Sequence, residues 1–162
     1  MDGIILSSAA LSNHSAIKEL NRQGSPLVVL DRALEVENIM TVYLDNVMGG
    51  YLATKHLAEF GHKKTGCITG PLTNQLTKNR FDGYKKALEE MQINFNKHFV
   101  YGGNFKTKSG ETGAEELIKA GVTAIFACND LMAYGVYKAI QEQGMKIPQD
   151  ISVVGFDDIY MS

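Results

Sequence analysis

Along the chain, short apolar runs alternate with longer segments in which apolar residues recur every three or four positions. The short runs are rich in β-branched and aromatic residues and favour strands, which we predict at residues 3–6, 26–30, 41–44, 64–69, 99–101, 124–127 and 151–155. Helical spacing predicts amphipathic helices between these strands. Their buried faces are expected to carry Leu52, Ala53, His56, Leu57 and Phe60 in residues 51–60, Phe81, Tyr84, Leu88 and Met91 in residues 80–91, Ala114, Leu117 and Ile118 in a third helix, and Met132, Val136, Ala139 and Ile140 in a fourth.

This alternation of strands and helices predicts an α/β fold with parallel strands and with helices on both faces of the sheet. Gly24, Gly61, Gly121 and Gly144 each follow a helical segment, where a left-handed glycine commonly ends a helix. Residues 31–41 depart from the alternation, because this polar stretch joins two predicted strands without helical spacing. We therefore place a passage between two α/β lobes in residues 31–41.

Composition narrows the possible classes of function. The 162 residues are 44% hydrophobic and 21% charged, and the formal net charge is −2. Nucleic-acid-binding domains usually carry a basic excess, so this segment is not expected to bind DNA by itself. No apolar run reaches the ~20 residues of a membrane helix. The start resembles a strand interior and not a signal peptide, so we expect residues to precede it.

The reactive side chains give little support to a metal site, a cofactor or catalysis. Cys67 and Cys128 each lie in an apolar, strand-like run, so we interpret them as buried free thiols in a reducing compartment. The four histidines show no metal-ligand spacing. No nucleotide-binding glycine pattern, nucleophile elbow or Ser/His/Asp set occurs. We therefore expect no metal, no cofactor and no enzymatic activity.

The most informative polar residues follow the last predicted strand. Residues 148–155 form a turn and a short apolar run that ends at Gly155, and Phe156, Asp157 and Asp158 come directly after it. In open α/β sheets, ligands bind beyond the carboxyl ends of the strands. An aromatic ring that packs on CH groups, beside a carboxylate that accepts from hydroxyls, suits a polyhydroxylated ligand.

Asn129 and Arg80 are two further candidates for this edge of the sheet. Asn129 ends a predicted strand, and its amide can both donate to and accept from a sugar hydroxyl. Asp130 is explained as the N-cap or as a first-turn acid of the next helix. Arg80 opens the helix predicted at residues 80–91, where a cation is unfavourable for the helix dipole. It is therefore expected to pair with Asp157 or with a ligand, unless it is a solvated surface residue.

Three residues have two interpretations each. Asp31 and Arg32 end another predicted strand and could present an acceptor and several donors to a ligand, but a surface turn explains this pair equally well. Phe105 follows the predicted strand at residues 99–101. Its ring either stacks on a ligand or packs on its own lobe.

The order and spacing of several segments resemble the effector-binding core of the LacI/GalR family of bacterial transcription regulators, over essentially the whole chain. The segments are residues 2–6, 26–32, 42–46, 49–50, 56–62, 70–71, 80–84, 124–130, 132–135 and 147–158. Periplasmic sugar receptors of ABC transporters share this fold and are the competing interpretation. Residues 56–62 and 147–158 resemble the regulators more than the receptors.

The resemblance implies a periplasmic-binding-protein-like type I fold, in which two Rossmann-like parallel-sheet lobes hold an effector between them. It assigns residues 1–45 to part of the N-terminal lobe and residues 46–162 to most of the C-terminal lobe. It also implies a DNA-binding helix-turn-helix domain and further strand–helix units before this segment. A last strand and the return crossovers are implied after it.

By position, the resemblance implies effector contacts from Asp31, Arg32, Arg80, Phe105, Asn129, Phe156 and Asp157. This set resembles that of ribose-binding relatives, so ribose or a related monosaccharide is the implied effector, and operator DNA is the implied partner of the absent domain. A cytoplasmic homodimer without membrane contact is implied as well. The remaining alternatives are a sugar-modifying enzyme and a regulator that senses a protein or a phosphorylated metabolite.

Overall fold

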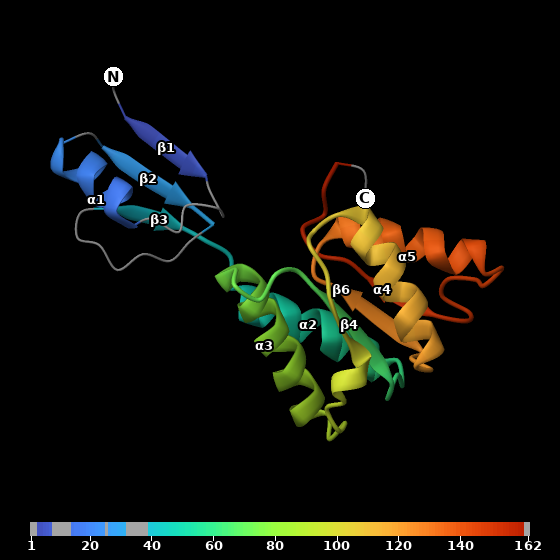
Figure 1. Cartoon of the computed structure of the whole chain (residues 1–162). Coiled ribbons are helices and arrows are strands. Elements are labelled where there is room, and N and C mark those ends of the chain that lie inside the picture. Colours follow the sequence, from blue (N-terminus) through green and yellow to red (C-terminus); the bar gives the residue numbers. More distant parts are fainter. Residues whose placement is uncertain (1–2, 8–13, 25, 32–38, 161–162) are drawn as a thin grey trace. The chain divides into compact units, whose positions relative to one another are not determined.

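The computed structural model describes residues 3–7, 14–24, 26–31 and 39–160, which form two compact units, Met1–Asp45 and Asn46–Ser162 (Figure 1). The first unit is a parallel sheet in the order β1-β2-β3 with one helix, α1. The bounds are β1 Ile4–Ser7, α1 His14–Arg22, β2 Leu27–Leu30 and β3 Met40–Val42. Ile17 of α1 packs with Leu27 and Val29 in a small buried core.

The connection between β2 and β3 corrects one prediction. The two strands are hydrogen-bonded neighbours of one sheet, with Val29 opposite Thr41. Residues 31–41 therefore join two strands of the same unit, and the predicted passage between lobes in that stretch is wrong. The chain enters the second unit only after Asp45. Missing helical spacing between two strands was not sufficient to mark a change of sheet.

The second unit is a four-stranded parallel sheet in the order β5-β4-β6-β7. Helices α2 and α3 pack against each other, as do α4 and α5, and the β4 and β6 strands lie between the two helix pairs (Figure 1). The bounds are α2 Asn46–Glu59, β4 Thr65–Thr69, α3 Gln75–Glu90, a short 3-10 helix Lys97–Phe99, β5 Val100–Gly102, α4 Thr107–Lys119, β6 Ala124–Ala127, α5 Asp130–Glu142 and β7 Ser152–Val154.

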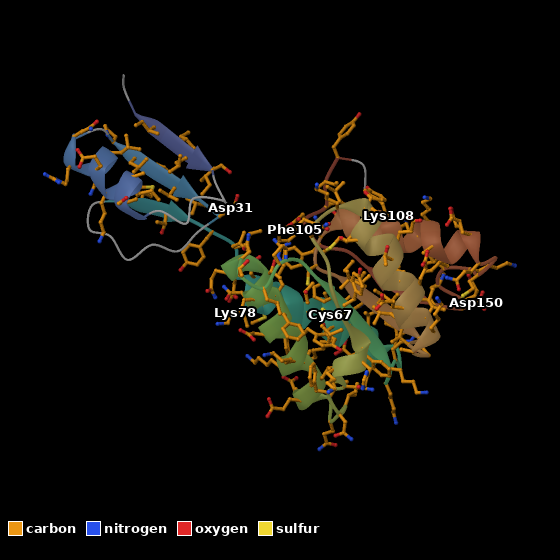
Figure 2. The ribbon with its side chains drawn as sticks, viewed as in Figure 1. Asp31, Cys67, Lys78, Phe105, Lys108 and Asp150 are labelled. Atoms are coloured by element: carbon orange, nitrogen blue, oxygen red, sulfur yellow. The ribbon has the colours of Figure 1, made fainter. Side chains whose placement is uncertain are left out.

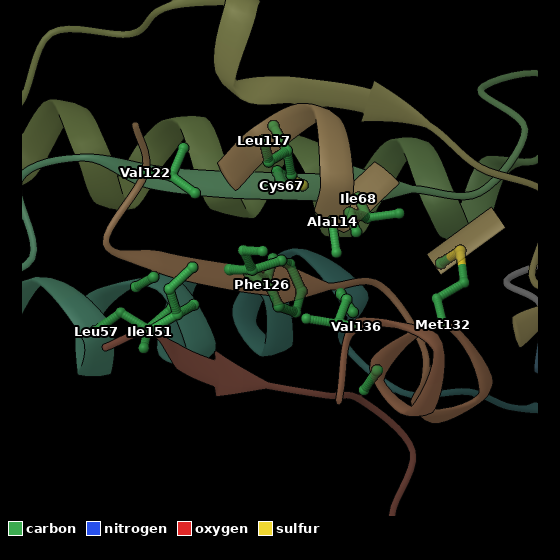
Figure 3. Packing of buried hydrophobic residues seen from close by; sticks show 14 of the residues in the cluster. Leu57, Cys67, Ile68, Ala114, Leu117, Val122, Phe126, Met132, Val136 and Ile151 are labelled. Carbon is green, nitrogen blue, oxygen red and sulfur yellow. The ribbon is translucent and has the colours of Figure 1, made fainter. Parts of the chain in front are cut away.

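The central strands carry the core of the second unit. All residues of β4 and β6 are buried, and Phe126 lies among side chains from both helix layers (Figure 3). A parallel strand that is covered on both faces needs a continuous apolar run, which is the pattern that predicted these strands. All seven predicted strands overlap an observed strand, so the predicted α/β architecture is confirmed.

The predicted helix faces are correct for α5 but wrong for α2. Met132, Val136, Ala139 and Ile140 are all buried on α5. Leu52 of α2 and Phe60, directly after it, are however 56% and 75% exposed, and the buried face carries Gly50, Thr54, Leu57 and Ala58. The apolar stripe chosen from the sequence therefore faces partly outward, because the packed face of α2 consists largely of small residues.

Two glycines explain why small residues face inward on α2. A Cβ atom on Gly50 would clash with the carbonyl oxygen of Arg80 on α3, and a Cβ atom on Gly83 of α3 would clash with the carbonyl oxygen of Val47. The backbones of α2 and α3 thus lie in direct contact. Gly110 of α4 and Gly135 of α5 make the same reciprocal contact on the other side of the sheet. Both helix pairs depend on the missing side chain of glycine.

Helix α3 starts earlier than the sequence predicted. Asn74 is its N-cap, and Asn74 Oδ1 accepts a hydrogen bond from the backbone N–H of Leu76 at 2.9 Å. Arg80 therefore lies in the second turn of α3, and the prediction that it opens the helix is wrong. The polar first turn of α3 lacks the apolar spacing on which the predicted boundary was based.

Candidate ligand-binding site

Loops from all four strands of the second unit meet at the carboxyl-terminal edge of its sheet. Gly70 follows β4, Phe105 follows β5, Asn129 follows β6, and Phe156 and Asp157 follow β7. Parallel strands place the loops that follow them at one edge, which is where open α/β sheets bind ligands. The candidate site is built from these loops and from the second turn of α3.

Arg80 is the centre of a hydrogen-bond network at this edge. Its Nε donates to Asn46 Oδ1 at 2.8 Å and its Nη1 donates to the carbonyl oxygen of Cys128 at 2.6 Å. Its Nη2 forms an ion pair with Asp157 Oδ1 at 2.9 Å. The pairing of Arg80 with Asp157, one of the two roles expected from the sequence, is present. The guanidinium is buried, whereas the Asp157 side chain is 35% exposed and faces solvent in part.

The ring of Phe156 packs within this network. The Arg80 guanidinium carbon lies 3.7 Å from the ring centroid, a close cation–π contact. The edge of the ring reaches α2, where a Cβ atom on Gly49 would lie only 2.5 Å from Phe156 Cε2. The paired glycines Gly49 and Gly50 thus have separate roles, because Gly49 admits this ring and Gly50 admits the backbone of α3.

The turn after β7 adopts an unusual backbone conformation. Asp157 and Asp158 have positive φ angles of 105° and 54°. Asp130 Oδ2 accepts the backbone N–H of Ile159 at 2.9 Å, and Asp130 Oδ1 lies against Gly155, where it would have to move to admit a Cβ atom. Such backbone strain costs about 1–3 kcal/mol per residue and persists only where the surroundings enforce it. Asp130 therefore shapes the turn that presents Asp157.

Asn129, and not Asp130, caps helix α5. Asn129 Oδ1 accepts the backbone N–H of Met132 at 2.9 Å, and Asn129 Nδ2 donates to the carbonyl oxygen of Phe105 at 3.2 Å. Asp130 is the first residue inside the helix, so of its two predicted roles the N-cap is wrong and the first-turn acid is confirmed. Asn129 joins the loops after β5 and β6, and its contact with a ligand stays a prediction.

Phe105 packs on its own unit. Its φ angle is 66°, and its half-buried ring covers Gly70, where any Cβ atom would clash with it. Figure 2 shows Phe105 in the second unit and Asp31 at the end of β2 in the first. Asp31 is exposed, with a φ angle of 62°, and Arg32 lies outside the described residues. The ligand contacts expected of these three residues stay predictions.

Thr77 carries an unpaired hydroxyl one turn before Arg80. Thr77 Oγ1 is buried without a hydrogen-bond partner in the described part of the chain, close to Gly70. We expect Thr77→Val, which keeps the shape but removes the hydroxyl, to raise the free energy of unfolding by about 1 kcal/mol in chemical denaturation. Thr54→Val is the matched control, because Thr54 is equally buried but donates to the Gly50 carbonyl at 2.9 Å. An equal gain from both variants would contradict the explanation.

The two cysteines lie just beneath the site. Cys67 and Cys128 are buried free thiols, as predicted, with their Sγ atoms 4.0 Å apart. Burial, followed by the hydrogen bond to Cys128, raises the pKa of Cys67 well above its usual value. The Cys67 thiol therefore stays protonated and acts as a core residue. In the described part of the chain, no three His, Cys, Asp or Glu side chains come together as metal ligands.

The sequence profile of the periplasmic binding protein-like domain matches residues 54–162. The chain belongs to this family. Its relatives place it among the effector-binding domains of LacI/GalR regulators, which confirms the resemblance and the predicted fold class. No described helix of this LacI/GalR domain is long and apolar enough to cross a membrane.

Two curated relatives and two solved structures illustrate the similarity. The ribose operon repressor of Haemophilus influenzae is 42% identical over 139 residues, which cover 85% of this chain and 42% of the relative. The transcriptional repressor PurR of Pasteurella multocida is 36% identical over 164 residues, 100% of this chain and 49% of the relative. This LacI/GalR chain thus spans about half the length of the curated relatives it matches.

The solved structures agree with this family over nearly the whole chain. A LacI-family regulator of Enterococcus faecium with bound ribose has a TM-score of 0.85 at 32% identity and covers 99% of this chain and 60% of that one. A sugar-binding LacI-family regulator of Escherichia coli, solved with phosphate, has a TM-score of 0.87 at 31% identity and covers 99% and 58%.

Proposed function

We propose that this chain is the effector-binding core of a bacterial transcriptional repressor and that its effector is a neutral monosaccharide such as ribose. The network of Arg80, Asp157 and Phe156 at the carboxyl edge of the sheet is the observation that carries the proposal. It presents a carboxylate and an aromatic ring at the position where α/β sheets bind ligands. The 42% identity to a ribose operon repressor favours ribose, and the names of the relatives favour a repressor over a transport receptor.

The hydrogen bonds and the ion pair that Arg80 already forms favour an uncharged ligand over a phosphorylated one. Its Nε and Nη1 already donate to Asn46 and to the Cys128 carbonyl, and Asp157 balances its charge. Phe156 covers one face of the guanidinium. A phosphate is best recognised by a bidentate pair of free N–H groups. Arg80 lacks such a free pair among the described residues, whereas Asp157, which is partly exposed, can accept from a sugar hydroxyl.

This arrangement and the family resemblance support the following proposed roles. Asp157 and Asn129 bind hydroxyl groups, Arg80 holds Asp157 and donates to ring or hydroxyl oxygens, and Phe105 and Phe156 pack on CH groups of the sugar. The family resemblance also assigns effector contacts to Asp31 and Arg32. In this proposal, residues 1–45 are part of the N-terminal lobe and residues 46–162 are most of the C-terminal lobe.

Binding of the sugar is proposed to control DNA binding by a helix-turn-helix domain outside this segment. The sugar must bind one conformation of the two lobes, open or closed, with higher affinity than the other. Only such a difference in affinity can shift a conformational equilibrium. The complete protein would be a cytoplasmic homodimer that binds operator DNA and catalyses no reaction. The repressors among the relatives support this assignment.

A calorimetric comparison of free and phosphorylated sugars tests the proposal. We expect the complete protein to bind ribose at least about tenfold more tightly than ribose 5-phosphate, because the phosphate would leave its charge poorly paired. Glucose serves as a size control. Binding of ribose 5-phosphate without binding of any free sugar would contradict the proposal and favour a regulator that senses phosphorylated metabolites.

A further inference from the structure

Asn46 is a buried polar residue to which sequence reasoning assigned no functional role. It is the first residue of α2 and also the first residue of the second unit, and it is only 4% exposed. Buried amides are retained where they form hydrogen bonds, because an unpaired polar group is costly in the interior. The partner of Asn46 is a residue of the candidate site.

Asn46 fixes the one donor of Arg80 that points back toward α2. Asn46 Oδ1 accepts from Arg80 Nε at 2.8 Å, while Nη1 and Nη2 point to the Cys128 carbonyl and to Asp157. A guanidinium is planar, so a hydrogen bond at Nε fixes the rotation of the whole group in its plane. This bond and the planarity of the group together direct the two Nη atoms to the Cys128 carbonyl and to Asp157.

The helices that carry Asn46 and Arg80 are held at a fixed separation. Helices α2 and α3 are in backbone contact through Gly50 and Gly83, which lie about one helical turn after Asn46 and Arg80. The separation between the two residues is therefore set by helix backbones and not by flexible side chains. A hydrogen bond between two helices held in this way changes its length when either helix is displaced slightly.

We propose that Asn46 is a positioning residue, which orients the Arg80 guanidinium toward Asp157 and links that orientation to the peptide where the chain enters the second unit. The proposal rests on the proposed function only in taking Arg80 and Asp157 as effector contacts. Any backbone change at Asp45–Asn46 moves the acceptor of Arg80 Nε. Effector affinity and the conformation of this connection are then coupled, and the coupling is reciprocal.

Two substitutions at Asn46 distinguish the loss of its hydrogen-bond acceptor from a change in the size of its side chain. Asn46→Leu keeps the approximate shape but removes the acceptor, and Asn46→Asp keeps an acceptor oxygen. Calorimetry on the complete protein is expected to show about tenfold weaker ribose binding for Asn46→Leu, the effect of losing a hydrogen bond to a charged group. Asn46→Asp should stay within about threefold of the wild type.

A double-mutant cycle distinguishes positioning from a general structural role. Lysine has no Nε–H group to place against Asn46, so Asn46→Leu should have no further effect on ribose affinity in an Arg80→Lys background. Asn74→Ala is the matched control, because it removes a helix-start hydrogen bond to Leu76 without touching Arg80. An equal loss of affinity from Asn46→Leu in both backgrounds would overturn the proposal.

A second measurement does not depend on any ligand. The Nε–H proton of Arg80 should be protected from solvent exchange in NMR spectra of the wild type and of Asn46→Asp, and exposed to exchange in Asn46→Leu. Retained protection in Asn46→Leu would overturn the positioning role. If no sugar binds the wild type, the proposed effector fails, and this measurement still decides the role of Asn46.

Discussion

Arg80→Ala is expected to weaken ribose binding at least tenfold and to destabilise the protein. Without the guanidinium, the oxygens of Asn46, Asp157 and the Cys128 carbonyl all lose a donor. Removing one partner of a buried charged pair costs about 2–5 kcal/mol of binding. The loss in unfolding free energy should be smaller, about 2 kcal/mol, because the Asp157 side chain is 35% exposed and partly solvated.

Asp157→Ala should weaken ribose binding by at least a similar factor of about ten, because it removes the acceptor proposed for the sugar hydroxyls. Calorimetry gives the affinities, and chemical denaturation gives the free energies of unfolding. Arg80→Lys and Asp157→Asn test the geometry, because each keeps the size or the charge but loses part of the planar, charged pairing. Intermediate affinities are expected for both.

An exposed ion pair on the same helix provides the control. Lys85 and Asp82 pair at 2.7 Å on α3, with side chains 44% and 41% exposed. Asp82→Ala should change the free energy of unfolding by less than about 1 kcal/mol and leave ribose affinity unchanged. Unchanged affinity in Arg80→Ala and Asp157→Ala would contradict the assignment of this site.

The sequence was sufficient to predict the strands because each buried parallel strand is a continuous apolar run. Strand β6, for example, is buried at every position and was predicted at its observed bounds, Ala124–Ala127. The pairing of Arg80 with Asp157 was one of the roles expected for Arg80 at this edge of the sheet, although the helix-start premise behind it is wrong. Local patterns of this kind depend only on spacing along the chain.

Features that depend on contacts across the fold could not be predicted in this way. The buried face of α2 was missed because Gly50 contacts α3 through its backbone. A pattern of hydrophobic side chains cannot reveal such a contact, since glycine has no side chain. Asn46 lies in one of the segments that resemble the family, but its side-chain role could not be predicted because it depends on a partner 34 residues away. Asn129 and Asp130 are both good capping residues, so only the observed hydrogen bonds assign the cap to Asn129.

The second large effect is expected at Gly83, where α3 touches α2. A Cβ atom there would clash with the Val47 carbonyl oxygen and lie 2.6 Å from the Tyr51 backbone nitrogen, and neither backbone atom can rotate away. An alanine in place of glycine normally stabilises a helix by about 1 kcal/mol. Here the forced separation of two helices should outweigh that gain and leave a net loss of about 1–3 kcal/mol in unfolding free energy.

Gly83→Ala should also reduce ribose affinity, because moving α3 away from α2 lengthens the 2.8 Å hydrogen bond from Arg80 Nε to Asn46. Gly102→Ala is the matched control, since no atom lies within 4 Å of a Cβ placed at Gly102. It should stay within about 0.5 kcal/mol of the wild type in unfolding free energy and bind ribose normally.

Denaturation curves and calorimetry on both variants test this prediction. A Gly83→Ala variant as stable as Gly102→Ala would show that the helices can separate freely. A loss of stability with unchanged ribose affinity would instead show that the Arg80 orientation does not depend on the contact between α2 and α3.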